Sequence, residues 1–537
     1  MADAIKTFLP LLGVLAAVAV LARRLNIAPS ILLVIAGIVL ALIPGLPSIE
    51  LAPEIVLLVI LPPLIYSAGV AMSWREFKFN LRPIVLLAFG CVVFTTCAIA
   101  AAAHYVLGLG WGTGFVLGAL IAPPDTVAPL AIARQLGLPR RLVVVLEGEG
   151  LANDATALIL YRFAVVAVAT GAFSLPEAAG TFSLIVVGEI VWGILAGWAS
   201  LHLRRWAHDP RVEITLSLMT PYLAFWVPQH LGGSGVLATV AAGLYVSWRG
   251  PLLISSATRL QGIFFWDLMV YLIEGMVFLV TGLQARRIIE NAQFFPLRDI
   301  IVATLLVTAI AIVARFVWVF PATYLPRWLS PSLRQRDPSP PWQQPFMLSV
   351  TGVRGIVSLA AALAIPLTTA AGTPFPNRDL ILFVTFGVII LTLVGIGPML
   401  PYIARWLGLG STAHEEQRRE RAAELTARRR LAELTSNRVD DLAKEIGLAD
   451  EALRTIKSRY DSRLALLPHS PEDGEFVSRR TRLRFALLEE ERKLLHELLR
   501  KGEITDEARR RIERDLDLEE ASFRTRSGGS DQGYTPL

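Results

Sequence analysis

Residues 145–158 of this chain read VLEGEGLANDATAL and place three acidic side chains and one asparagine inside an apolar segment. The segment, residues 142–169, is long enough to cross a membrane as a single helix. A charged side chain at bilayer depth costs roughly 2.5–3.5 kcal/mol on insertion scales, so several together indicate a shared polar interior instead of contact with lipid. The stretch therefore predicts a membrane helix with a polar function.

The four polar side chains of this stretch fall on two adjoining helix faces. Glu147 and Asp154 are seven residues apart, which is two turns or about 10.5 Å along one face. Glu149 and Asn153 are i,i+4 neighbours on the other face. Each could be a hydrogen-bonded structural residue. For the central Asp154 we favour a site, because burial disfavours the charged carboxylate and a bound cation favours it. A group that exchanges a proton for a metal ion needs this property.

The same pattern of long apolar segments with few charges extends over the first 410 residues. Residues 1–410 hold 25 Lys and Arg and 18 Asp and Glu, whereas residues 411–537 hold 26 and 27. Soluble proteins do not concentrate apolar residues in this way, so a wholly soluble enzyme is excluded. The pattern predicts thirteen membrane spans, near residues 7–22, 27–44, 54–71, 83–107, 112–133, 142–169, 181–203, 212–228, 232–248, 262–283, 300–325, 345–366 and 379–404.

The joints between the spans predict the orientation and the domains. Lys and Arg follow spans 1, 3, 5, 7, 9 and 11, and the joints after spans 2, 4, 6 and 8 have none. The positive-inside rule then places the N-terminus outside and the C-terminus in the cytoplasm, although Arg286, Arg287 and Arg298 after span 10 depart from it. We expect a transmembrane domain over residues 1–410, a charged cytoplasmic helical domain over 411–525 and a disordered C-terminus over 526–537.

Two of the predicted spans are interrupted. Ile121–Pro129 reads IAPPDTVAP, and its prolines remove backbone donors around Asp125. Thr351–Ser358 reads TGVRGIVS, with two glycines beside Arg354; a buried arginine with a structural partner is the alternative there. These are spans 5 and 12 of thirteen, so they occupy the same place in two halves of a 6+1+6 arrangement. Corresponding broken spans in an inverted repeat point to a transporter site.

The segment Gly148–Leu158, GEGLANDATAL, resembles the sodium/proton exchangers of the monovalent cation/proton antiporter superfamily, in the branch with an Asn-Asp pair. Similar blocks follow in the family's order and cover residues 5–405: Leu61–Gly69, Ala119–Pro129, Ser234–Leu244, Phe265–Leu283 and Gly352–Leu359. The charged tail is similar to that of bacterial members. The resemblance implies an all-α membrane protein of thirteen helices with a 6+1+6 inverted repeat, a homodimer, alternating access and a place in the bacterial inner membrane.

The resemblance also implies a cation and proton site. Asp154 is its shared carboxylate, Asn153 is the partner of Asp154, and Asp125 assists by hydrogen bonding or by coordinating Na⁺ or another monovalent cation. Ser67 stands where some bacterial members have a carboxylate, and Pro124 where some have a hydroxyl residue. These two departures leave the preferred cation open.

Interior ion pairs are implied as well. Glu149 is expected to pair with Arg315 in preference to Arg354, a choice that the sequence leaves open. Glu274 lies four residues before Phe278, at a position where some members carry an acid and others an asparagine. These four charged residues, Glu149, Arg315, Arg354 and Glu274, are expected to support the site.

The function that the resemblance implies is exchange of Na⁺ for H⁺, one for one and electroneutral, with Asn153 leaving one fewer titrating charge beside Asp154. A K⁺/H⁺ or Li⁺/H⁺ antiporter is the first alternative, and an intramembrane hydrolase or a membrane sensor is a remote one. The chain has no HExxH motif, so we expect no enzyme. We expect no cofactor and no nucleic-acid partner; the partners are monovalent cations, protons and membrane lipid.

Overall fold

The computed structural model of the protein describes residues 2–25, 27–44, 52–171, 173–291, 296–369, 372–447, 450–465, 474–501 and 503–526. Almost all of them are helical, and the single β-bridge among them joins Thr368 to Pro374. The chain divides into two compact units, Met1–Ala413 and His414–Leu537. Disorder was predicted for residues 526–537: Arg526 is the last residue of a helix, and residues 527–537 lie outside the described residues.

The elements of the first unit follow the apolar segments of the sequence. Most are α-helices: α1 (Ala2–Leu25), α2 (Pro29–Ala41), α3 (Pro53–Ile55), α4 (Leu61–Ala71), α5 (Trp74–Phe79), α6 (Leu81–Val85), α7 (Val92–Tyr105), α8 (Trp111–Ile121), α9 (Val127–Gln135), α10 (Arg140–Thr170), α11 (Leu175–Ala207), α12 (Pro210–His230), α13 (Val236–Leu253), α14 (Ser256–Leu283), α15 (Ala285–Asn291), α16 (Leu297–Leu329), α17 (Pro331–Arg336), α18 (Gln343–Val350), α19 (Ile356–Leu363), α20 (Arg378–Ile390) and α21 (Leu400–Trp406). Wider π-helical turns occur at Val56–Ile60, Leu86–Cys91 and Leu391–Ile396, and a short 3₁₀ turn at Gly397–Met399.

Within the described residues, eight helical stretches are long and apolar enough to cross a membrane. They are Pro53–Ala71, Leu81–Tyr105, Arg140–Thr170, Leu175–Ala207, Val236–Leu253, Ser256–Glu290, Leu297–Leu329 and Arg378–Trp406. Pro29–Ala41 and Trp111–Ile121 are shorter apolar helices. The fold is therefore that of an all-helical membrane protein. Two of the thirteen predicted spans are split by interruptions into helices too short to span by themselves.

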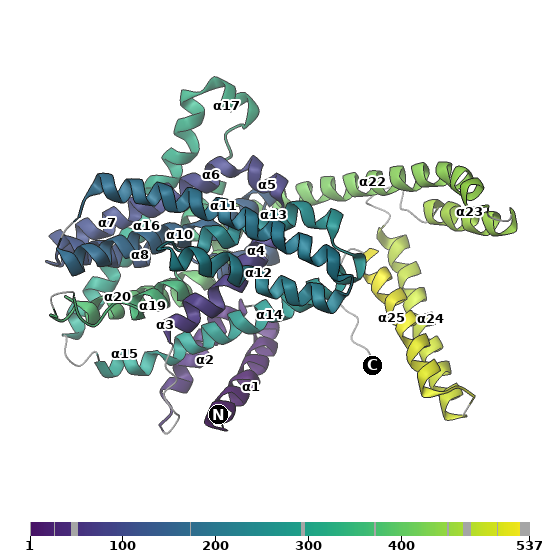
Figure 1. Ribbon diagram of the computed structural model, residues 1–537, viewed down its shortest axis with the longest axis horizontal. Coiled ribbons are helices and arrows are strands. Elements are labelled where there is room, and N and C mark those ends of the chain that lie inside the picture. Colours follow the sequence, from purple (N-terminus) through teal and green to yellow (C-terminus); the bar gives the residue numbers. More distant parts are fainter. Residues whose placement is uncertain are drawn as a thin grey trace. The chain divides into compact units, whose positions relative to one another are not determined.

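The helices of the first unit pack in neighbouring groups. In one group α11 packs along α13, and α13 along α4. In another, α10 packs against α8, and α16 against α7 and α20; α19 also lies beside α20 (Figure 1). The pair α2 and α14 is so close at Gly37 and Gly282 that a Cβ on either glycine would overlap the backbone of the other helix. Small residues allow this approach between membrane helices. Helix α10 also contacts α13 and α4, so the two groups meet at this helix.

The second unit consists of charged helices, namely α22 (Leu409–Ile446, which begins in the first unit), α23 (Asp450–Ala465), α24 (Gly474–Arg500) and α25 (Asp506–Arg526). Helices α24 and α25 lie side by side (Figure 1), and Leu488, Leu495 and Leu516 form a small core within this unit. Arg492 pairs across them with Asp517 at 2.6 Å. Outward faces rich in charge are typical of a helical hairpin surrounded by water.

Candidate functional site

Both interruptions that the sequence predicts are present in the structure. Helix α8 ends at Ile121 and α9 begins at Val127, while α18 ends at Val350 and α19 begins at Ile356. Non-helical backbone is tolerated at membrane depth only where protein or a water-filled cavity satisfies its polar groups. Here each interruption supplies partners for the other.

The two interruptions are hydrogen-bonded to each other. The backbone N–H of Asp125 donates to the carbonyl of Val353 at 2.6 Å, and the Arg354 Nε donates to the carbonyl of Ile121 at 2.9 Å. The close approach requires a glycine, because a Cβ at Gly355 would overlap the Asp125 side chain. We call the place where these two interruptions meet the crossing. It holds Asp125 in a defined position. Its Oδ1 accepts from the N–H of Val127 at 3.0 Å, at the first turn of α9.

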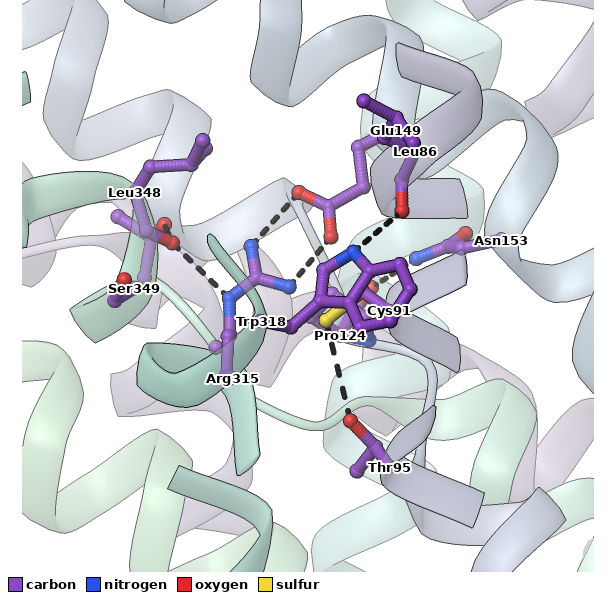
Figure 2. A network of polar contacts seen from close by, with 12 residues as sticks. Leu86, Cys91, Thr95, Pro124, Glu149, Asn153, Arg315, Trp318, Leu348 and Ser349 are labelled. Carbon is purple, nitrogen blue, oxygen red and sulfur yellow. Dashed lines mark hydrogen bonds and ion pairs between the residues drawn. The ribbon is translucent and has the colours of Figure 1, made fainter. Parts of the chain in front are cut away.

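Asn153 and Asp154 reach this crossing from the middle of the unbroken α10. The Asn153 Nδ2 donates to the carbonyl of Pro124 at 2.7 Å, which ties α10 to the interruption after α8 (Figure 2). The Asn153 Oδ1 is buried and accepts no hydrogen bond from the described residues. Asp154 is half-buried and interacts electrostatically with Asp125. Within the described part of the chain no side-chain hydrogen bond or ion pair engages the Asp154 carboxylate.

Glu149 lies about one turn before Asn153 and is paired with Arg315 of α16. The two guanidinium nitrogens Nη1 and Nη2 lie 2.5 and 2.7 Å from the two carboxylate oxygens, and both side chains are almost fully buried. The Arg315 Nε also donates to the carbonyl of Leu348 on α18 at 3.0 Å (Figure 2). This bidentate pair links α10, α16 and the first half of the second broken span. Two charged, planar groups matched in this way satisfy each other at membrane depth.

The other predicted charges take different positions. Arg354 is buried and makes no ion pair with a described carboxylate; its guanidinium donates to the carbonyls of Ile121 and Gly352 instead. Glu274 on α14 is half-buried, within electrostatic range of Asp125, and likewise makes no ion pair with a described residue. Glu149 was the alternative partner for Arg354, but both of its carboxylate oxygens accept from Arg315.

Sequence reasoning missed one partner of the crossing and one helix cap elsewhere in the bundle. Thr392 accepts from the N–H of Arg354 at 3.0 Å, and it lies in an apolar span where only its hydroxyl could have marked it. Glu189 of α11 accepts from the N–H groups of Gly235 and Leu237 at 2.9 and 3.0 Å and caps the start of α13. Glu189 lies 45 residues before Ser234 in the sequence, so the residues around the start of α13 do not indicate that it is the cap.

The donor set at the crossing suits a weakly held hard cation. Hard cations take oxygen ligands, and Asp154, Asp125 and the carbonyls of the interrupted backbone are oxygen donors. Among the described residues no group of three or more His, Cys, Asp or Glu side chains could hold a metal ion. The arrangement brings together two carboxylates, Asp154 and Asp125, and the amide of Asn153.

Comparison with known proteins agrees with the resemblance found in the sequence. The family model described as "sodium/hydrogen exchanger, transmembrane" matches residues 11–406. An uncharacterised Na⁺/H⁺ exchanger of Mycobacterium tuberculosis is 34% identical over 515 residues, which are 94% of this chain and 93% of that protein. A sodium, potassium, lithium and rubidium/H⁺ antiporter of Bacillus pumilus is 32% identical over 380 residues, covering 68% of this chain and 56% of that protein.

The fold has a solved counterpart. The sodium proton antiporter MjNhaP1 from Methanocaldococcus jannaschii superposes with a TM-score of 0.59 over 76% of this chain and 99% of that chain, at 21% identity, which shows a shared fold. The resemblance predicted from the sequence is thus confirmed, and the relatives are named as transporters and not as enzymes. The family model covers most of the chain and the mycobacterial relative nearly all of it, so this protein belongs to the sodium/hydrogen exchanger family of cation/proton antiporters.

Proposed function

We propose that the protein exchanges Na⁺ for H⁺ across the membrane, with Asp154 as the shared binding group. The observation that carries the proposal is the position of this carboxylate, which is half-buried at the middle of α10 beside two interrupted helices and engages no described side chain. A carboxylate in that position binds either a proton or a cation. It does not hold both at once. Each time the site turns from one side of the membrane to the other, it therefore carries either a cation or a proton, and the return step carries the other.

Two neighbouring side chains, Asp125 and Asn153, complete the proposed site, and a buried ion pair supports its helix. Asp125 lies within electrostatic range of Asp154 and supplies a second oxygen ligand or a hydrogen bond. Asn153 holds the interruption in place through the carbonyl of Pro124 and adds no charge. Its buried Oδ1, which lacks a donor among the described residues, is a further acceptor near the site. Glu149 and Arg315 brace α10 without taking part in the exchange.

The movement proposed is alternating access in a membrane domain over residues 1–410. In this proposal thirteen spans form a 6+1+6 inverted repeat, and the broken spans 5 and 12 occupy equivalent places in it. The contacts of α10 support the idea, because this helix of one group carries Asp154 and packs against α13 and α4 of the other group. We also propose a homodimer in a bacterial inner membrane, an outer N-terminus and a cytoplasmic helical domain over residues 411–525.

Exchange is proposed to be one Na⁺ for one H⁺. Asn153 stands where a second acid would add a titrating charge, so the loaded and exchanged forms of the site differ by one cation and one proton only. Transport would then be independent of membrane potential. In proteoliposomes, imposing a K⁺/valinomycin potential should leave the exchange rate unchanged, and a rate that follows the potential would contradict this stoichiometry.

A second candidate is an antiporter of broader selectivity, including K⁺ and Li⁺. The observation in its favour is the relative from Bacillus pumilus, which is named as an antiporter of sodium, potassium, lithium and rubidium. Proton movement in proteoliposomes with a preset pH gradient distinguishes the two. Adding Na⁺, Li⁺ or K⁺ in turn shows which cation collapses the gradient, and Na⁺ is expected to do so at the lowest concentration.

The same assay tests the site. The Asp154→Asn variant should collapse no gradient with any cation, because an amide neither releases a proton nor supplies a charge. The matched control is Asp299→Asn, which removes an exposed carboxylate in the first turn of α16 and should transport as the wild type does. Exchange that survives in folded Asp154→Asn protein would refute the role of Asp154.

A further inference from the structure

A cavity lined by three arginines lies apart from the proposed cation site. It is formed by the start of α6 and α10, the end of α16, and α18, and its lining includes Arg82, Arg141 and Arg327 together with apolar groups such as Leu86 and Val319. The space that it offers to water-sized molecules measures about 60 Å³, which is room for about four or five water molecules. That space suits a group of about five heavy atoms.

The three arginines share one carboxylate. Arg82 Nη2 and Arg327 Nη2 lie 3.0 and 2.8 Å from Oδ2 of Asp337, and Arg141 Nη2 lies 2.8 Å from its Oδ1. Among the described residues none of the three pairs with another carboxylate. Asp337 therefore neutralises one of three guanidinium charges, and the cavity keeps an excess of two positive charges.

One of these guanidinium groups also lacks an acceptor. The Nη1 of Arg82 is buried and donates to no described atom. A buried donor without a partner is costly, and more so when it is charged. The same arginine lines the cavity, and its other terminal nitrogen, Nη2, is held by Asp337. The excess of positive charge at the cavity calls for an oxyanion, and the orphaned donor shows that the Arg82 guanidinium is not fully satisfied by Asp337.

We propose that this cavity binds the phosphate group of an anionic phospholipid. The planar guanidinium fork matches phosphate oxygens, and Arg is preferred over Lys for this contact. Arg82 and Arg141 begin membrane helices and Arg327 ends one, so all three lie at one end of the bundle, where the surface of a bilayer presents head groups. Basic pockets between membrane helices bind anionic head groups. Free phosphate has the same chemistry, and only the experiment separates the two sources.

The site would act on the helices that carry the ion pair. Val145 of α10 and Leu348 of α18 belong to the lining, and the carbonyl of Leu348 accepts from Arg315. A phosphate held by α6, α10 and α16 would join three helices at the end of the bundle. Binding should therefore stabilise the folded protein against heat.

The test is thermal melting of the purified full-length protein in detergent with added phosphatidylglycerol, phosphatidylcholine or inorganic phosphate. Phosphatidylglycerol at a hundredfold excess over its Kd should raise the Tm by about 3 °C for a unit of about 400 residues. Phosphatidylcholine, which has no net charge, should give a smaller shift. An equal shift with inorganic phosphate alone would overturn the assignment to lipid.

Variants locate the effect in the cavity. Arg82→Gln combined with Arg141→Gln should abolish the phosphatidylglycerol shift, whereas Arg334→Gln, which removes an exposed arginine of α17 outside the cavity, should keep it. Asp337→Asn removes the competing carboxylate, so it should lower the Tm without lipid and enlarge the shift with lipid. If Asp337 and its three arginines had only a structural role, the Tm shift caused by phosphatidylglycerol would not become larger in this variant. A wild-type shift that persists in the double variant would overturn the site.

Discussion

Replacing Arg315 by Met would test whether the buried ion pair supports the fold. Arg315 is 2% exposed and Glu149 0%, so the variant leaves a carboxylate uncompensated in the interior. It also removes the donor to the carbonyl of Leu348. Breaking one partner of a buried pair costs about 3–5 kcal/mol. At about 2 cal/mol/K of unfolding entropy per residue, this lowers the Tm of a unit of about 400 residues by roughly 4–6 °C.

The assay compares melting curves at one scan rate in one detergent, for the wild type, Arg315→Met, Glu149→Leu and the double variant. The double variant should melt near the wild type, because apolar residues of similar volume often replace a buried pair without loss. The matched control is Arg336→Met, an exposed arginine of α17, which should change the Tm by less than about 1 °C. A double variant that is less stable than either single variant would refute the reasoning, since the cost would then not arise from an unpaired charge.

Two further predictions concern the crossing. Asn153→Asp adds a second acid beside Asp154, so transport in proteoliposomes should become sensitive to membrane potential; an unchanged, potential-independent rate would contradict the role given to Asn153. Gly355→Ala should reduce exchange at least tenfold while the protein still folds, because the added Cβ overlaps Asp125 and moves it by several tenths of an ångström or more. Gly180→Ala, where a Cβ meets nothing within 4 Å, is the control and should transport normally.

Local features of the fold could be predicted from the sequence because they depend on neighbours along the chain. Apolar runs of spanning length became helices, since a backbone in lipid must satisfy its own hydrogen bonds. Pro123 and Pro124 predicted the interruption after α8, because proline has no backbone N–H to donate within a helix. The seven-residue spacing of Glu147 and Asp154 puts both on one helix face by the helical period alone.

The partners across the bundle could not be predicted in this way. Glu149 and Arg315 are 166 residues apart, and Arg354 was also an available cation by composition. Packing of α16 against its neighbours decided the pairing, and it left Arg354 to the carbonyls of the crossing. The sequence also did not predict that Asp337 forms ion pairs with three arginines from three different helices.

The sequence by itself determined the family, the membrane helices, the two broken spans and the central place of Asp154, because hydropathy, proline chemistry and helical period act over one segment at a time. The tertiary structure decided which groups meet. It joined Asp125 to the carbonyl of Val353, Asn153 to that of Pro124 and Glu149 to Arg315. Such contacts depend on the distances between packed helices, which no single segment specifies, and they decide which buried charges are satisfied and which stay available for a cation.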